Sequence, residues 1–195
     1  MEETGEEFHD VSEPKSLEEA LRLKEEGNSS FRAGEPLTAL SLYQRALAVL
    51  PEDPEDSRCA ETAAILLCNQ AACELATQQY DATVESCTKA LEKKTGLPKA
   101  YLRRSKAFEL LEKFADAFED LKKYMELCPE DKSLAKHLVE LEKKKQEQFE
   151  RQKTEVWGQL KDLGNTILGK FGMSLDNFQA VQDPNTGSYS IQYKS

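Results

Sequence analysis

Three basic residues recur at helical spacing in the middle of the chain: Lys99, Arg103 and Lys106. Residues three and four apart share one face of a helix, so a helix over residues 99–107 would present a cationic stripe. Such a stripe can hold carboxylates through charge-assisted hydrogen bonds, although most charge stripes are solvated surface. The functional interpretation gains weight because the sequence frame around this stripe occurs twice more in the chain.

Composition narrows the classes of partner. The chain has 195 residues, 39% of them hydrophobic, and a formal net charge of −10. This length and hydrophobic content predict one globular domain with tails. Nucleic acid and anionic membranes are poor candidate partners, because both require a dominant basic surface.

Signals for export are missing from the sequence. Met1-Glu2-Glu3 is followed by no basic and apolar leader, and no stretch approaches the ~20 apolar residues of a membrane span. The number of cysteines is odd, and none forms a Cys-x-x-Cys pair; they are Cys59, Cys68, Cys73, Cys87 and Cys128. We therefore expect reduced thiols and a cytoplasmic protein.

Catalytic and cofactor motifs are not found. The sequence contains no Gly-rich phosphate loop, no Gly-x-Ser-x-Gly and no His-Glu-x-x-His, and its two histidines are His9 and His137. Cys68 and Cys73 share a predicted helix but lack the further ligands that a metal ion requires. We predict a protein that is not an enzyme and that holds neither metal nor cofactor.

The elements that would position the basic stripe begin after an acidic segment. Residues 1–15 are too charged and too poor in apolar groups to offset their ordering entropy, and we expect a disordered tail. Ser16 is then a helix N-cap with Glu19 three residues later. A first helix is predicted up to Gly34 and a second from residue 37 to 50, so the two form a helical hairpin.

This hairpin recurs with a period of 34 residues. Ala39, Ala46 and Pro51 are matched 78 residues later, which equals two periods plus ten, by Ala117, Tyr124 and Pro129. The ten extra residues lie between the first two copies, at 54–63. Three repeats are therefore predicted within residues 16–131, at about 20–53, 64–97 and 98–131.

The repeats resemble the tetratricopeptide repeat family. The match is carried by Lys-Glu-Glu-Gly-Asn at residues 24–28, by Ala39-x3-Tyr43-x2-Ala46-Leu47 and by Ala117-x3-Leu121 with Pro129. The second copy is the weakest, with Thr83 and Cys87 where the family has Ala and an aromatic residue. The resemblance implies an all-α right-handed superhelix of three helix-turn-helix repeats, in which the first helix of each pair lines a concave groove.

Two further segments follow the repeats. A helix capped by Asp131 or Ser133 is predicted over residues 132–163, and the resemblance implies that it covers the last repeat. In the tail, residues 164–195, we expect glycines, including Gly164, to end helical structure. Strands at 178–182 and 188–193 around the turn 183–187 predict a small β-hairpin.

The resemblance also implies a clamp for the C-terminal carboxylate of a partner peptide. The five clamp positions of the family hold matching residues here, namely Lys24, Asn28, Asn69, Lys99 and Arg103. A terminal aspartate carries two carboxylates, which need several charge-assisted donors, and Asn amides add donors without further charge. Lys24, Asn28 and Asn69 are thereby assigned to the main-chain carboxylate, and Lys99 and Arg103 to neighbouring oxygens.

An apolar pocket beside the clamp is assigned to Phe31, Ala72 and Leu75, which would hold the side chain before the terminal aspartate. All three are equally consistent with ordinary repeat core, because apolar residues at helical spacing usually pack inward. Some clamp domains carry a Lys where this chain has Ala76. Lys106 is the candidate auxiliary donor.

The family likeness implies a co-chaperone adaptor that binds peptides ending in Glu-Glu-Val-Asp, the tails of cytosolic seventy- and ninety-kilodalton heat-shock chaperones. A different class remains open: a signalling scaffold that binds a GTPase or its regulator through the convex face or the C-terminal tail. The two differ in a testable way, because adaptor binding requires a free partner C-terminus and weakens with salt.

Overall fold

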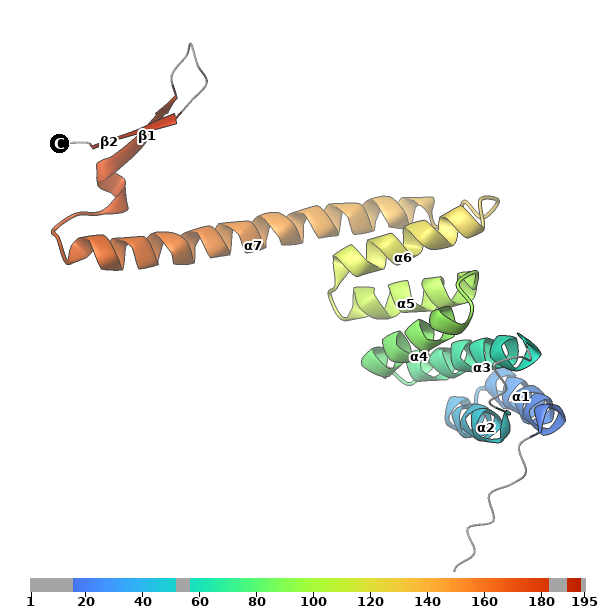
Figure 1. Cartoon of the computed structure of the whole chain (residues 1–195). Coiled ribbons are helices and arrows are strands. Elements are labelled where there is room, and N and C mark those ends of the chain that lie inside the picture. Colours follow the sequence, from blue (N-terminus) through green and yellow to red (C-terminus); the bar gives the residue numbers. More distant parts are fainter. Residues whose placement is uncertain (1–15, 52–56, 183–188, 194–195) are drawn as a thin grey trace, which may run out of the picture. The chain divides into compact units, whose positions relative to one another are not determined.

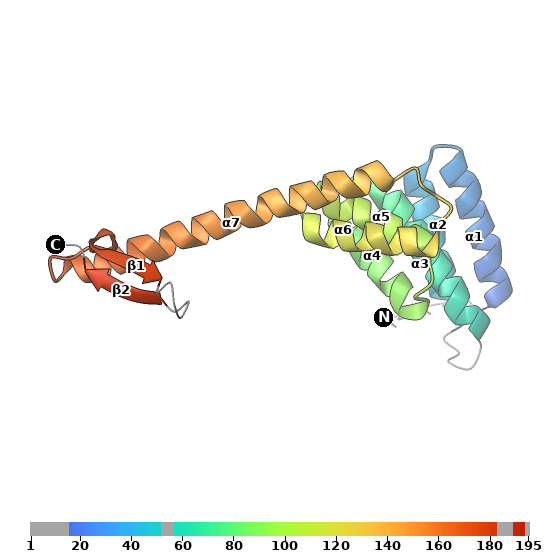
Figure 2. The same ribbon diagram turned by 90° about the horizontal axis from the view of Figure 1, so that it is seen from above.

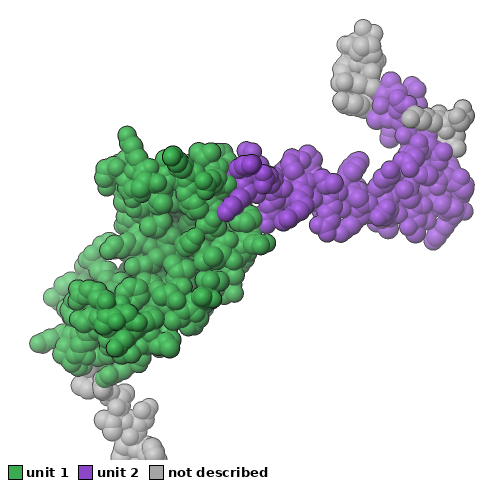
Figure 3. Space-filling view, turned by 180° about the vertical axis from the view of Figure 1, so that it is seen from behind, with its two compact units in different colours: residues 1–142 green, residues 143–195 purple. Residues whose placement is uncertain are grey.

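A computed structural model describes residues 16–51, 57–182 and 189–193. The chain divides into two compact units, residues 1–142 and 143–195 (Figure 3). Helices make up nearly all of the regular structure in the described ranges, with one two-stranded sheet near the end. The predicted helical class is confirmed. The acidic segment 1–15 and the predicted turn at 183–187 lie outside the described residues.

The first helical pair is α1 (Leu17–Arg32) and α2 (Pro36–Val49) (Figure 1). Ser16 caps α1 as predicted, since its hydroxyl accepts a hydrogen bond from the Glu19 amide at 3.4 Å. The turn between the helices contains Gly34 at φ +83°, a left-handed conformation that glycine adopts without strain. Gly27 allows α1 to approach the buried ring of Tyr43 on α2.

Two further antiparallel pairs stack on the first (Figures 1 and 2). They are α3 (Ser57–Ala76) with α4 (Tyr80–Lys93), and α5 (Pro98–Leu110) with α6 (Phe114–Leu127). The first helices of the pairs are also in contact with one another, α1 with α3 and α3 with α5. These three helices therefore form one layer, and the predicted helix-turn-helix repeats are confirmed.

Most of the insertion between the first two repeats is helical. α3 begins at Ser57, so the residues up to Ala63 lengthen it by about two turns. Cys59, Thr62 and Ala63 are buried there, and this burial favours helix over loop. In the weakest repeat, Thr83 and Cys87 are both fully buried, so a larger and a smaller side chain fill the core positions that the family gives to Ala and to an aromatic residue.

An ion pair joins the two helices of the last repeat. Arg104 on α5 donates two hydrogen bonds to the Asp120 carboxylate on α6, from Nε at 2.7 Å and from Nη2 at 2.9 Å. The guanidinium also lies over the rings of Tyr101 and Phe108. The Asp120 partner raises the pKa of Arg104 further, which keeps the charge fixed between the two helices.

After the repeats comes α7 (Ala135–Gly169). Asp131 does not cap this helix. Its Oδ1 accepts from the Ser133 amide at 3.0 Å, so it closes the turn that precedes α7. The expected break at Gly164 is wrong as well, since Gly164 lies inside α7. A Cβ at this position would come within 2.6 Å of Leu175 Cδ1. Glycine serves close packing at this position.

The second unit ends in a short 3₁₀ helix, η1 (Leu175–Asn177), and the strands β1 (Phe178–Gln182) and β2 (Tyr189–Tyr193). The strands pair antiparallel with Ala180 opposite Ile191, which confirms the predicted hairpin. Asn165 on α7 holds η1, because its Oδ1 accepts from the Leu175 amide at 2.7 Å.

No helix in the described ranges is long and apolar enough to cross a membrane. Among the same residues, no group of three or more His, Cys, Asp or Glu side chains is arranged to hold a metal ion.

Candidate functional site

Three of the five predicted clamp residues meet at one pocket. Asn28, Asn69 and Arg103 come from α1, α3 and α5, and their side chains line a cavity of about 210 Å³. The other lining residues are Phe31, Arg32, Tyr43 and Ala72. Two residues of the predicted apolar pocket, Phe31 and Ala72, thus share a cavity with the polar donors.

A hydrogen-bond network orders the two amides. Asn28 Oδ1 accepts from the Tyr43 hydroxyl at 2.8 Å and from Asn69 Nδ2 at 3.1 Å. Burial raises the pKa of Tyr43 to about 12, so its hydroxyl stays protonated and remains a donor at neutral pH. With two donors facing Oδ1, the amide group of Asn28 is oriented and its Nδ2 hydrogens point elsewhere.

Those hydrogens meet Glu25, whose Oε2 accepts from Asn28 Nδ2 at 3.2 Å. Lys24 lies on the other side of the same carboxylate, with Nζ 3.3 Å from Glu25 Oε1. The hydrogen bond from Asn28, and then that from Lys24, lowers the pKa of Glu25. A ligand carboxylate would therefore compete with Glu25 for donors on α1.

Arg103 is half-buried and anchored on α3. Its Nη1 donates to the Cys68 carbonyl oxygen at 2.6 Å and contacts Cys68 Sγ at 2.8 Å. Its Nη2 and Nε hydrogens have no acceptor within the described part of the chain. The anchor fixes the guanidinium plane, and the remaining N–H groups stay available for a carboxylate.

The two predicted clamp lysines lie outside the pocket lining. Lys24 is mostly buried along its stem, with 19% of its side chain exposed, and is paired with Glu25. Lys99 is exposed on α5 and forms no ion pair with any described residue. Both keep long, rotatable side chains, so their distance from an anion depends on rotamer choice.

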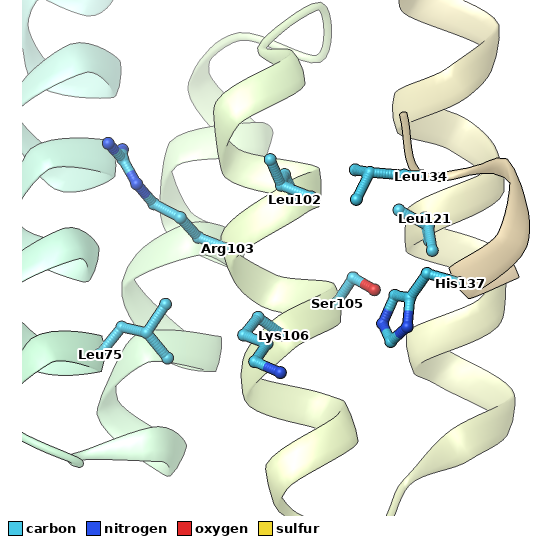
Figure 4. A pocket seen from close by; sticks show the side chains of 8 residues that line it. All are labelled: Leu75, Leu102, Arg103, Ser105, Lys106, Leu121, Leu134 and His137. Atoms are coloured by element: carbon cyan, nitrogen blue, oxygen red, sulfur yellow. The ribbon is translucent and has the colours of Figure 1, made fainter. Parts of the chain in front are cut away.

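Leu75 and Lys106 line a second cavity of about 340 Å³ between α3, α5, α6 and the start of α7 (Figure 4). Its lining residues are Leu75, Leu102, Arg103, Ser105, Lys106, Leu121, Leu134 and His137. Arg103 borders both cavities. Of the three residues predicted for the apolar pocket, Leu75 lines this second cavity, whereas Phe31 and Ala72 line the first.

Glu109 on α5 organises the polar edge of the second cavity. Its Oε2 lies 3.3 Å from Lys106 Nζ and 3.1 Å from His137 Nε2. Lys106 therefore has a carboxylate partner in this structure, as Lys24 has in Glu25.

Sequence reasoning missed several lining residues. Tyr43 is a repeat core residue by its spacing, and its ring is buried, but its hydroxyl also reaches the site. Arg32 could have been predicted from the sequence, because it lies four residues after Asn28 and therefore shares its helix face. His137 lies beyond the repeats, and nothing in the spacing connects it to α5.

Comparisons with known proteins find this fold in other chains. Sperm-associated antigen 1 of Rattus norvegicus is 33% identical over 124 residues, which are 64% of this chain and 13% of that protein. The chain therefore spans only about an eighth of the curated relatives it matches first. No protein-family model matches.

Two solved structures are similar in fold. The myosin chaperone UNC-45 from C. elegans, in complex with a Hsp90 peptide, is 30% identical with a TM-score of 0.62, covering 69% of this chain and 14% of that chain. The second TPR domain of human RPAP3, in complex with the HSP70 peptide SGPTIEEVD, is 26% identical with a TM-score of 0.55, covering 64% and 96%. Helices α1–α6 thus have the fold of a tetratricopeptide repeat domain.

Proposed function

We propose that this chain is a non-catalytic, cytosolic co-chaperone adaptor whose groove binds the Glu-Glu-Val-Asp tails of seventy- and ninety-kilodalton heat-shock chaperones. The observation that carries the proposal is the meeting of Asn28, Asn69 and Arg103, from three helices, at one cavity. UNC-45 and the second TPR domain of RPAP3, which are similar to this chain, are in complex with an Hsp90 peptide and an HSP70 peptide, and this supports the same class of ligand.

The terminal carboxylate would enter between the two amides. It would take the Asn69 Nδ2 hydrogen that now reaches Asn28 at 3.1 Å, and would compete with Glu25 for Asn28 Nδ2. Arg103 would donate from Nη2 or Nε to the aspartate side chain while Nη1 stays on Cys68. These are charge-assisted bonds, which exceed neutral ones in strength.

The remaining predicted residues take supporting roles. Lys24 and Lys99 would swing toward the bound carboxylates as flexible point charges. Phe31 and Ala72 would contact the valine that precedes the terminal aspartate, since both line the same cavity as the donors. Charge-assisted bonds of about 1.5–3 kcal/mol each, offset by ordering of the peptide, predict micromolar affinity.

The test is a calorimetric titration of a peptide ending in Glu-Glu-Val-Asp, as free acid and as C-terminal amide. We expect wild type to bind the acid and not the amide, with affinity that falls as salt rises. Arg103→Ala should weaken binding by about tenfold or more, because a charge-assisted bond is lost. Lys123→Ala is the matched control, since it removes the same charge from an exposed position on α6.

Arg103 also holds α5 to α3, so a second variant separates binding from folding. Asn69→Ala removes one donor, and Asn28 keeps its bond from Tyr43. Far-ultraviolet circular dichroism should show both variants folded. Equal binding of acid and amide, or no effect of either variant, would refute the clamp.

A further inference from the structure

The part of α7 in the second unit carries an exposed apolar surface. Six large apolar side chains there are between 53% and 69% exposed, namely Phe149, Val156, Trp157, Leu160, Leu163 and Ile167. Single exposed apolar residues are ordinary, but six within 19 residues of one helix form a contiguous patch. A helix with such a face usually has a partner.

Five of these residues fall on a heptad. Phe149, Val156 and Leu163 lie seven apart, Leu160 and Ile167 lie seven apart, and the two series alternate by four and three. This is the a and d pattern of a coiled coil, with Phe149, Val156 and Leu163 at d. We call these five residues the heptad stripe. Trp157 lies beside it at an e position.

The 3₁₀ helix η1 of the same unit packs on an adjacent face of α7. Leu175 lies against Gly164, and its amide donates to Asn165. Lys161 Nζ forms an ion pair with Asp176 at 2.8 Å. In the described part of the second unit these contacts leave the heptad stripe more than half exposed, so its own tail does not cover it.

We propose that the heptad stripe pairs with the same stripe of a second copy of this chain, as a parallel two-stranded coiled coil. Symmetric pairing stacks Val156, Leu160, Leu163 and Ile167 each on its counterpart. In this register Lys145 at a g position faces Glu150 at the e position of the other copy, and this pair carries opposite charges.

Lys153 occupies the one polar a position between Phe149 and Leu160. A single polar residue at a is the kind that specifies register and two strands, at some cost in stability. It now pairs with Glu150 of its own helix at 3.1 Å, so its charge has a partner before and after association.

The size of the patch suits a reversible dimer. Burying side chains of this kind removes roughly 100 Å² each from solvent at their present exposure, and two copies together give roughly 1,200 Å². That area is at the lower limit of specific interfaces. We therefore expect association in the micromolar range, and it does not depend on the groove or its ligand.

The test is sedimentation velocity of the full chain between about 1 and 200 µM. We expect the mass to rise from 22.0 kDa toward twice that value as concentration increases. Leu160→Asp should weaken the dimer by more than about tenfold, because a charge enters an a layer. Thr154→Asp, the same new side chain at an exposed b position of α7, is the control and should dimerise like wild type.

The variant Lys153→Ile tests the parallel, in-register pairing of the two stripes, because it should increase the affinity of the dimer. In the parallel pairing the isoleucine meets itself at an a layer, and the dimer should tighten by about tenfold or more. A chain that stays monomeric throughout, a dimer that Leu160→Asp leaves intact, or Lys153→Ile without tightening would each overturn the proposal. A wild-type monomer would point instead to an unrelated partner for the stripe.

Discussion

Gly27 lies inside α1 against the ring of Tyr43, and Gly27→Ala tests how closely the first two helices must approach. An ideal Cβ at Gly27 would come within 2.6 Å of Tyr43 Cε1 and 2.9 Å of Cδ1. The ring is only 2% exposed and its hydroxyl is bonded to Asn28, so it has no free space into which to move. The substitution therefore overpacks the interface.

The expected sign opposes helix propensity. In an open helix, Gly→Ala stabilises by about 1 kcal/mol. Here overpacking costs about 1–3 kcal/mol, and loss of the Tyr43–Asn28 hydrogen bond costs about 0.5–1.5 kcal/mol. We expect the free energy of unfolding to fall by about 1–3 kcal/mol, measured by urea unfolding followed by circular dichroism.

Two further variants identify the cause. Gly158→Ala is the matched control, because nothing lies within 4 Å of a Cβ at that helical position, and it should not destabilise. In a Tyr43→Leu background, which removes the ring, Gly27→Ala should cost much less. If Gly27→Ala is as stable as wild type, or costs the same in both backgrounds, the close-approach argument is refuted.

Two other predictions concern the last repeat. Asp120→Asn should lower the free energy of unfolding by about 3 kcal/mol in urea, because it removes the carboxylate partner of Arg104 between the helices. The exposed Asp116→Asn on the same helix should change it by less than about 0.5 kcal/mol. Equal effects would contradict a special role for the ion pair. Hydrogen bonds from Ser133 and Tyr124 lower the pKa of Asp131 from its usual 3.8. The ionised carboxylate therefore stabilises the folded state fully at pH values above the unfolded pKa of 3.8. This stabilisation is lost as the pH falls through the lower pKa of the folded state. The difference in unfolding free energy between wild type and Asp131→Asn should stay constant down to about pH 5 and then shrink below 3.8, and a constant difference throughout would exclude the mechanism.

Much of the fold could be predicted because repeats carry local and periodic signals. The N-cap at Ser16 and the helix stop at Gly34 depend on one or two helical turns, and the 34-residue period depends on one repeat. None of these signals depends on packing between distant parts of the chain. The same periodicity placed Asn28, Asn69 and Arg103 on the first helices of successive pairs. Their meeting at one cavity follows from stacking of equivalent faces.

From the sequence alone, a glycine that ends a helix cannot be told from a glycine that lies inside one, and the reason is physical. Gly34 follows a helix and has a positive φ, whereas Gly164 lies within α7 and leaves room for Leu175, which packs where a side chain would be. Both are glycines beside helical patterns, and only the backbone angle and the neighbouring side chain distinguish them.

The sequence by itself determined the helical class, the three repeats and the hairpin, since these depend on residue type and spacing. The candidate clamp residues came from the resemblance to the tetratricopeptide repeat family. Only the tertiary structure decided which atoms of those residues are engaged. Asn28 is oriented by Tyr43, fifteen residues away, and by Asn69, forty-one residues away. Hydrogen bonds and close packing between helices depend on ångström-scale distances, which residue spacing along one helix does not specify.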